Sequence, residues 1–456
     1  MTEHAAVRQL VRGRLFGAVA AGAVVLALLL ALCAAQPGRR DDGRPPGVKS
    51  GAPGPARPEL GWGFTHTRYS ADAGEEEAVG RVAEALAPHR LPQAQHLMGW
   101  GAENPEPSPG RYDFEALDSR MAFVEESRGV PVLTLCCAPD WMKGGRPGDT
   151  DWSRLEEAPK PEHYADFARL AATVARRYPR VRHFLVWNEL KGFFDDAKGR
   201  WDHEGYTQLY NLVYEAVKRA RPDALVGGPY VVLDNVDPDD SPYASPLRGP
   251  WGSVDRRSTA ALSYWNTHKR GADFVVVDGS AYTKDGRFLP DVFGATEMFT
   301  DVTRWVRRET GLPVWWAEWY VERGDERDRR DGWSEPRRVA AHASALVAMV
   351  RGGATTGFYW NPQTRRGRCP GCLWAGTADA DGGGTLSLFD LLTRFSAAFG
   401  PGAELRGLPD EPPEGVLLLA SERAVLAVNQ RPGPVRVRVE GRSLTLDGYE
   451  VRWLES

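Results

Sequence analysis

The sequence predicts an α/β protein in which a (β/α)8 barrel is followed by a small C-terminal antiparallel β domain. From Leu60 onward, short apolar runs alternate with longer amphipathic stretches. Eight such runs occur between residues 60 and 361, and this alternation predicts parallel strands joined by right-handed helical crossovers. After residue 402 the pattern changes to short alternating strands separated by turns, which is typical of an antiparallel sheet.

The eight apolar runs predict the barrel strands in order. They are 60–64, 96–101, 130–137, 183–189, 224–229, 273–282, 312–320 and 356–361. Between them, segments such as 161–179 and 204–222 have helical periodicity, and Pro222 ends the second of these. An open doubly wound sheet is the alternative fold, but no glycine-rich phosphate loop follows an early strand.

The N-terminal region differs in composition from the rest of the chain. Residues 1–15 are basic, 16–35 are apolar and uncharged, and 36–58 are rich in proline, glycine and charge. Twenty apolar residues can span a bilayer as a helix, and the preceding arginines favour a cytoplasmic N-terminus. The alternatives are an uncleaved anchor and a cleaved signal peptide, so the chain is expected at the cell membrane as a single-pass protein or secreted.

This organisation predicts that residues 36–58 are a flexible linker, 59–401 the barrel and 402–456 a β-sandwich-like accessory domain. The 57 basic and 61 acidic residues give a net charge of only −4. Since neither half of the chain is strongly basic, no nucleic-acid partner is expected. The oligomeric state is left open.

The cysteines outside the apolar segment form two close pairs. Cys369 and Cys372 lie in a CPGC loop, and in an exported protein this spacing favours a local disulfide. A zinc site that combines them with Cys136 and Cys137 is the alternative. The histidines have no ligand spacing, so neither a metal nor a cofactor is expected.

Polar residues at the ends of the predicted strands indicate where the chemistry lies. In such barrels the active site is at the C-terminal ends of the strands. Glu189 ends the fourth predicted strand and Glu318 ends the seventh, on facing sides of the barrel mouth. Two facing carboxyl groups are what glycoside cleavage requires. The alternative for each glutamate alone is a loop residue or an ion-pair partner.

Six stretches, in order, resemble glycoside hydrolase family 39, which contains retaining β-xylosidases and α-L-iduronidases. They are ENPEPSPGRYDFEALD (103–118), LTLCCAPDWM (133–142), VWNEL (186–190), LVGGPYVV (225–232), LPVWWAEW (312–319) and GFYWN (357–361). The resemblance covers about residues 60–400. It implies a barrel enzyme whose acid/base and nucleophile are glutamates after the fourth and seventh strands.

The resemblance also implies roles for particular residues. Glu189 matches the acid/base and Glu318 the nucleophile, and Asn188 would contact the 2-hydroxyl of the sugar. Tyr282 would hold the nucleophile. The sugar platform would come from Trp360 and Trp319, and for both the alternative is ordinary packing.

Three positions depart from the family pattern. Leu190 stands where proline is usual, Ser280 where a histidine precedes the tyrosine of the sixth strand, and Ala317 where threonine is common. The expected function is therefore a membrane-tethered retaining glycosidase, β-xylosidase-like, that acts on a plant or microbial glycan with a sugar not fixed as xylose. The alternatives are another glycosidase of the clan, such as an endo-glucanase, mannanase or β-galactosidase-like enzyme, and a non-catalytic carbohydrate-binding relative.

Overall fold

A computed structural model describes residue 57 and residues 59–323 and 332–455. The predicted basic region 1–15, the apolar segment 16–35 and all of the linker 36–58 except Arg57 lie outside these residues. Over the part of the chain that the structure describes, no helix is both long and apolar enough to cross a membrane. The described residues belong to one compact unit, 56–456.

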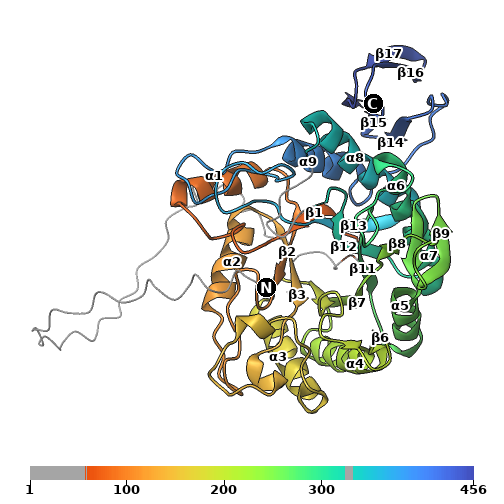
Figure 1. The fold of residues 1–456 in the computed structure, drawn as a ribbon. Coiled ribbons are helices and arrows are strands. Elements are labelled where there is room, and N and C mark those ends of the chain that lie inside the picture. Colours follow the sequence, from red (N-terminus) through yellow and green to blue (C-terminus); the bar gives the residue numbers. More distant parts are fainter. Residues whose placement is uncertain (1–56, 58, 324–331, 456) are drawn as a thin grey trace, which may run out of the picture. The chain divides into compact units, whose positions relative to one another are not determined.

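Eight parallel strands close into a barrel, as the alternation of strands and helices predicts (Figure 1). Their order around the barrel is β1-β2-β3-β4-β7-β11-β12-β13, and β13 pairs with β1. The strands are β1 (Gly61–Thr65), β2 (Pro92–His96), β3 (Val130–Leu135), β4 (His183–Val186), β7 (Leu225–Val232), β11 (Phe274–Ser280), β12 (Val314–Tyr320) and β13 (Ala354–Tyr359). Because all eight are parallel, their C-terminal ends meet at one mouth of the barrel.

A helix follows each barrel strand and lies on the outside of the barrel (Figure 1). These helices are α1 (Glu76–Leu86), α2 (Glu115–Glu126), α3 (Tyr164–Arg177), α4 (His203–Ala220), α5 (Arg256–His268), α7 (Glu297–Thr310), α8 (Glu335–Gly352) and α9 (Ser387–Phe399). A short helix, α6 (Val292–Ala295), precedes α7. Two small sheets lie in the connections between barrel strands. One is the pair β5 (Phe194–Asp195) and β6 (Arg200–Trp201), after β4. The other, after β7, has three strands, with β10 (Gly252–Asp255) between β8 (Asn235–Val236) and β9 (Ala244–Gly249).

The second barrel strand begins earlier than the sequence predicts. The apolar run 96–101 is mostly loop, and the strand is Pro92–His96, whose sequence PQAQH looks polar. Gln93 and Gln95 are nevertheless fully buried: Gln93 donates to Ser127, and Gln95 accepts from Arg120 at 2.6 Å. Hydrogen bonds to the α2 layer thus make a polar strand compatible with burial.

Two buried layers hold the barrel together. The interior is filled by one side-chain set from the strands, which includes Ala94, Val132, Leu185, Phe274, Val276, Trp315 and Phe358. A second, larger set fills the layer between strands and helices. Strands that are covered on both faces have near-continuous apolar sequences, which is the pattern that predicted them.

Five short strands follow the barrel at the predicted places: β14 (Val416–Ala420), β15 (Ala424–Asn429), β16 (Val435–Val439), β17 (Arg442–Leu446) and β18 (Val451–Glu455). They form a three-stranded antiparallel sheet, β14-β15-β18, and a β16-β17 hairpin. Trp453 packs against Phe399 of α9, and Gln430 donates to Ser344 of α8. These strands therefore pack on the α8–α9 side of the barrel.

Candidate active site

Three carboxylates meet at the C-terminal mouth of the barrel. Glu189 follows β4, Asp278 lies on β11 and Glu318 lies on β12. One oxygen from each lies within 4.8 Å of an oxygen from both of the others. Asp278 and Glu318 are 1% and 2% exposed. The structure thus brings together the two glutamates singled out in the sequence and adds an aspartate that sequence reasoning missed.

A bulge in β12 directs Glu318 into the barrel. In the pairing of β11 with β12, Val277 lies opposite Trp316 and Asp278 lies opposite Glu318, so Ala317 is the extra residue. Ala317 packs with the interior cluster, and Glu318 also faces the mouth. Bulges of this kind redirect side chains beside active sites.

Two tyrosines hold the Glu318 carboxylate. The Tyr230 hydroxyl donates to Oε1 at 2.7 Å, and the Tyr320 hydroxyl donates to Oε2 at 2.5 Å. Burial, followed by the charge of Glu189, raises the pKa of Glu318 above its usual range, and the two tyrosines and Lys191 act against this rise. The tyrosines therefore favour the carboxylate form that a nucleophile needs.

Glu189 sits in a tight, strained turn and is bound by a lysine. Trp187, Glu189 and Leu190 all have positive φ, of 71°, 51° and 52°, which non-glycine residues adopt only at a cost. Lys191 Nζ lies 2.8 Å from Glu189 Oε2 and 2.7 Å from a Glu156 oxygen. Burial disfavours the charged form of Lys191, but the charges of Glu189 and Glu156 outweigh this effect and raise the pKa of its ammonium group.

Unpartnered polar groups lie beside the carboxylates. Among the described residues, no hydrogen-bond partner reaches Oδ1 of Asn188 or either ring nitrogen of His96, although both residues are fully buried. Burial, and next the charge of Lys191, lowers the pKa of His96 to about 3, so the ring is neutral at pH 7. Buried polar atoms without partners at the mouth of a site are positioned to bind a ligand.

An aromatic group lies beside His96. The His96 ring is 4.1 Å from that of Trp100, and Trp360 meets both rings edge-on at 6.3 Å. Lys191 lies over the Trp100 ring. Trp360 is half-buried at the end of β13, and its role as a sugar platform stays a prediction. Trp100 was missed because the run 96–101 was assigned to a strand.

Trp319 does not face the barrel mouth. Its side chain is 2% exposed and packs on the outer side of the strands, near Phe299, His342 and Tyr359. The bulge at Ala317 places the residue after Glu318 on this outer face. The structure thus favours the packing alternative for Trp319.

Tyr282 follows β11 and packs edge-on against Phe288. The hydroxyls of Tyr230 and Tyr320 donate to Glu318, and the role that the resemblance implied for Tyr282 stays a prediction. Tyr230 was missed because, in the apolar stretch LVGGPYVV, it looks like a core residue.

The four cysteines outside the N-terminal segment form two disulfides. Cys369 pairs with Cys372, and Cys136 pairs with its neighbour Cys137 at the end of β3. The two pairs are therefore not gathered in one zinc site. The three mouth carboxylates are the set of described side chains that could hold a cation, and Lys191 already supplies a positive charge there.

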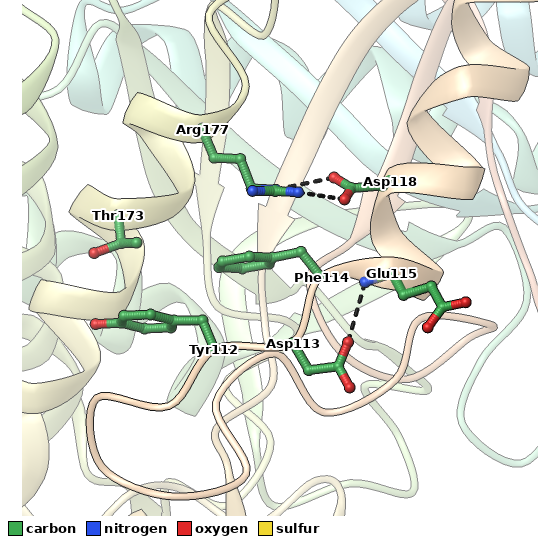
Figure 2. A pocket seen from close by; sticks show the side chains of 7 residues that line it. All are labelled: Tyr112, Asp113, Phe114, Glu115, Asp118, Thr173 and Arg177. Carbon is green, nitrogen blue, oxygen red and sulfur yellow. Dashed lines mark hydrogen bonds and ion pairs between the residues drawn. The ribbon is translucent and has the colours of Figure 1, made fainter. Parts of the chain in front are cut away.

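A separate cavity of about 540 Å³ lies between the loop before α2 and helix α3 (Figure 2). Tyr112 and Phe114 stack in it, and Arg177 lies over the Phe114 ring. Arg177 is bound to Asp118 through an ion pair. The arginine of this cavity is thus already paired, and Asp113 accepts a hydrogen bond from the Glu115 backbone N–H.

No protein-family model matches this sequence, and no curated protein matches it either. Solved structures do match its fold. A family 39 β-xylosidase from Caulobacter crescentus is 18% identical, with 85% of this chain and 81% of that chain covered and a TM-score of 0.51. A family 39 glycoside hydrolase from Bacteroides cellulosilyticus WH2 is 13% identical, with 87% and 79% covered and a TM-score of 0.52.

A conserved exported protein from Bacteroides fragilis has a TM-score of 0.59 at 12% identity, with 86% of this chain and 96% of that chain covered. Identities this low establish the fold alone. The chain has a barrel fold like that of family 39 glycoside hydrolases, with three carboxylates at its mouth.

Proposed function

We propose that this protein is a retaining glycoside hydrolase in which Glu318 is the nucleophile and Glu189 is the acid/base. The observation that carries the proposal is the close approach of these glutamates from strands on facing sides of the barrel. Oxygens within 4.8 Å of each other agree with the short carboxyl separation of about 5–5.5 Å in retaining enzymes. The wider spacing of inverting enzymes leaves room for a water between the groups.

The geometry supports a double displacement. Glu318, held by two tyrosine hydroxyls, attacks the anomeric carbon while Glu189 gives a proton to the departing oxygen. Water then enters beside Glu189, which takes its proton, and the glycosyl ester on Glu318 is hydrolysed. Asn188 and His96 supply unpartnered polar atoms for sugar hydroxyls, and Trp360 supplies a ring face.

The substrate we propose is a plant or microbial glycan, cleaved in a β-xylosidase-like reaction. This part rests on the sequence resemblance and on the β-xylosidase among the structures of similar fold. The predicted N-terminal segment would export the domain and, if uncleaved, tether it to the membrane.

The test is hydrolysis of a panel of aryl glycosides by the full-length chain. Glu318→Ala should lower kcat by several orders of magnitude, and added azide should restore turnover as a glycosyl azide of inverted configuration. The matched control is Glu106→Gln, which changes a buried glutamate outside the mouth. Absence of cleavage by the wild type across the panel and on polysaccharides would refute the enzyme assignment. A first-formed product with inverted configuration would refute retention alone.

A further inference from the structure

Asp278 is a third carboxyl group inside the candidate site, and a two-glutamate mechanism does not use it. It lies opposite Glu318 in the pairing of β11 with β12 and is 1% exposed. Its oxygen lies within 4.8 Å of both glutamates. Among the described residues, no hydrogen-bond donor reaches its Oδ2 atom.

The groups that face Asp278 leave it surrounded by negative charge. Glu189 and Lys191 come from the turn after β4, Tyr230 from β7, and Glu318 and Tyr320 from β12. The single ammonium group, that of Lys191, is shared with Glu156.

Two buried carboxylates this close cannot both stay ionised without a large cost, so one of them keeps a proton. Burial raises the pKa of Asp278 well above its usual range, and the charges of Glu189 and Glu318 and a hydrogen bond with Glu189 raise it further. Burial and the two neighbouring glutamates therefore favour the protonated form of Asp278.

The surroundings of Glu189 alone do not suit a general acid. The Lys191 ammonium lies 2.8 Å from its Oε2 atom, so this oxygen is already engaged in an ion pair. An acid must nevertheless deliver a proton to the leaving oxygen. A neighbouring carboxylic acid with an oxygen within 4.8 Å of Glu189 removes this conflict.

We propose that Asp278 and Glu189 act as a carboxylic acid–carboxylate pair that shares the proton given to the leaving group; this rests on the proposed glycosidase function. As the bond from the anomeric carbon to the leaving oxygen breaks, the proton on Asp278 moves to Glu189, and Glu189 delivers a proton to the leaving oxygen. The pair becomes fully ionised while Glu318 loses its charge in the glycosyl ester.

The second half-reaction reverses these changes. Water attacks the anomeric carbon, its proton goes to Glu189, and the proton shared with Asp278 is restored as the ester bond to Glu318 breaks. The net charge of the cluster is the same before and after each half-reaction, because the pair carries its second negative charge only while Glu318 is esterified. Asp278 acts through Glu189, so it is a positioning and proton-storing residue that does not touch the sugar.

The test compares leaving groups in the Asp278→Asn variant of the full chain. The dinitrophenolate of a dinitrophenyl glycoside can leave without being protonated, whereas the phenolate of a phenyl glycoside needs a proton in order to leave. We expect kcat/KM for the phenyl glycoside to fall by about 10²–10³-fold, in the range of general acid catalysis. For the dinitrophenyl glycoside, kcat/KM should fall by less than about tenfold. The basic limb of the pH profile of kcat/KM should also move.

The controls separate this role from a structural one. Asp273→Asn changes the aspartate before β11, which pairs with Lys218 away from the mouth, and should leave both substrates unchanged. Asp278→Ala is measured in parallel, so that a folding defect in one variant does not decide the outcome. Equal losses on both substrates, or no loss on either, would overturn the proton-sharing role. A wild type that cleaves neither glycoside would instead overturn the proposed function, and the role of Asp278 with it.

Discussion

Removal of the Tyr320 hydroxyl tests how the candidate nucleophile is kept ionised. In Tyr320→Phe, Oε2 of Glu318 loses its 2.5 Å hydrogen bond, while Tyr230 still donates to Oε1. A hydrogen bond to a charged group contributes about 1.5–3 kcal/mol. Since one pKa unit corresponds to about 1.4 kcal/mol, the pKa of Glu318 should rise by about one to two units.

The sign of the expected pH effect follows from the role of Glu318. A nucleophile must be ionised, so the acidic limb of the kcat/KM profile reports its deprotonation. In Tyr320→Phe this limb should move to higher pH by about one to two units. Below the limb, activity should fall by about 10–100-fold relative to the wild type, and the deficit should shrink as the pH rises.

The assay is kcat/KM for an aryl glycoside across the pH range. Tyr230→Phe should shift the same limb in the same direction, because its hydroxyl binds the other oxygen of Glu318. Tyr210→Phe is the matched control: it removes a buried tyrosine hydroxyl that donates to the Gly271 carbonyl, away from the site. If the limb does not move in Tyr320→Phe, or if it moves equally in Tyr210→Phe, the reasoning is wrong.

Three further predictions concern stability and packing. Gly63→Ala would place a Cβ atom 1.9 Å from the Pro92 carbonyl oxygen on the neighbouring strand. We therefore expect a loss of soluble folded protein, or a free energy of unfolding that is lower by at least about 3 kcal/mol when measured by denaturant titration. Burial lowers the pKa of His66 to about 3 and that of His183 to about 4. Below about pH 6.5 the unfolded chain therefore binds protons that the folded chain does not, so Tm should fall as the pH is lowered from 6.5 to 4. A His66→Gln variant should show a smaller fall in Tm over the same pH range. Trp319→Phe should lower Tm, because it leaves a void in the core, but should change KM less than twofold; a large rise in KM would restore Trp319 to the sugar site.

The sequence predicted the barrel and the position of its mouth because seven of the eight strands had clear apolar runs and because Glu189 and Glu318 stood at the ends of two of them. The second strand was misplaced because PQAQH lacks that pattern. Its glutamines are buried through partners such as Ser127 and Arg120, which come from the α2 region far along the chain. No local property of residues 92–96 reports those partners.

The site residues that were missed share a different cause. In a parallel barrel both faces of a strand are buried, so apolar periodicity does not show which residues face inward. Tyr230 and Asp278 therefore looked like parts of a core strand and of its extension. Bulges add to the difficulty, because one extra residue exchanges the two faces. Ala317 is such a residue, and it turns Glu318 inward and Trp319 outward.

The three departures from the family pattern lie on both sides of the site: Leu190 follows Glu189, whereas Ser280 and Ala317 lie on β11 and β12. On the nucleophile side, Glu318 accepts hydrogen bonds from two tyrosine hydroxyls, which oppose the rise of its pKa to about 8 that burial and the charge of Glu189 cause. On the other side, Lys191 binds Glu189, and Asp278 stands where its proton can compensate for that lysine. In the proposed mechanism, the proton stored on Asp278 passes through Glu189 to the leaving oxygen in the first half-reaction, and Glu189 takes a proton from water in the second. We therefore expect the effect of the Asp278 variants to depend on the leaving group and the effect of the Tyr320 variants to depend on pH.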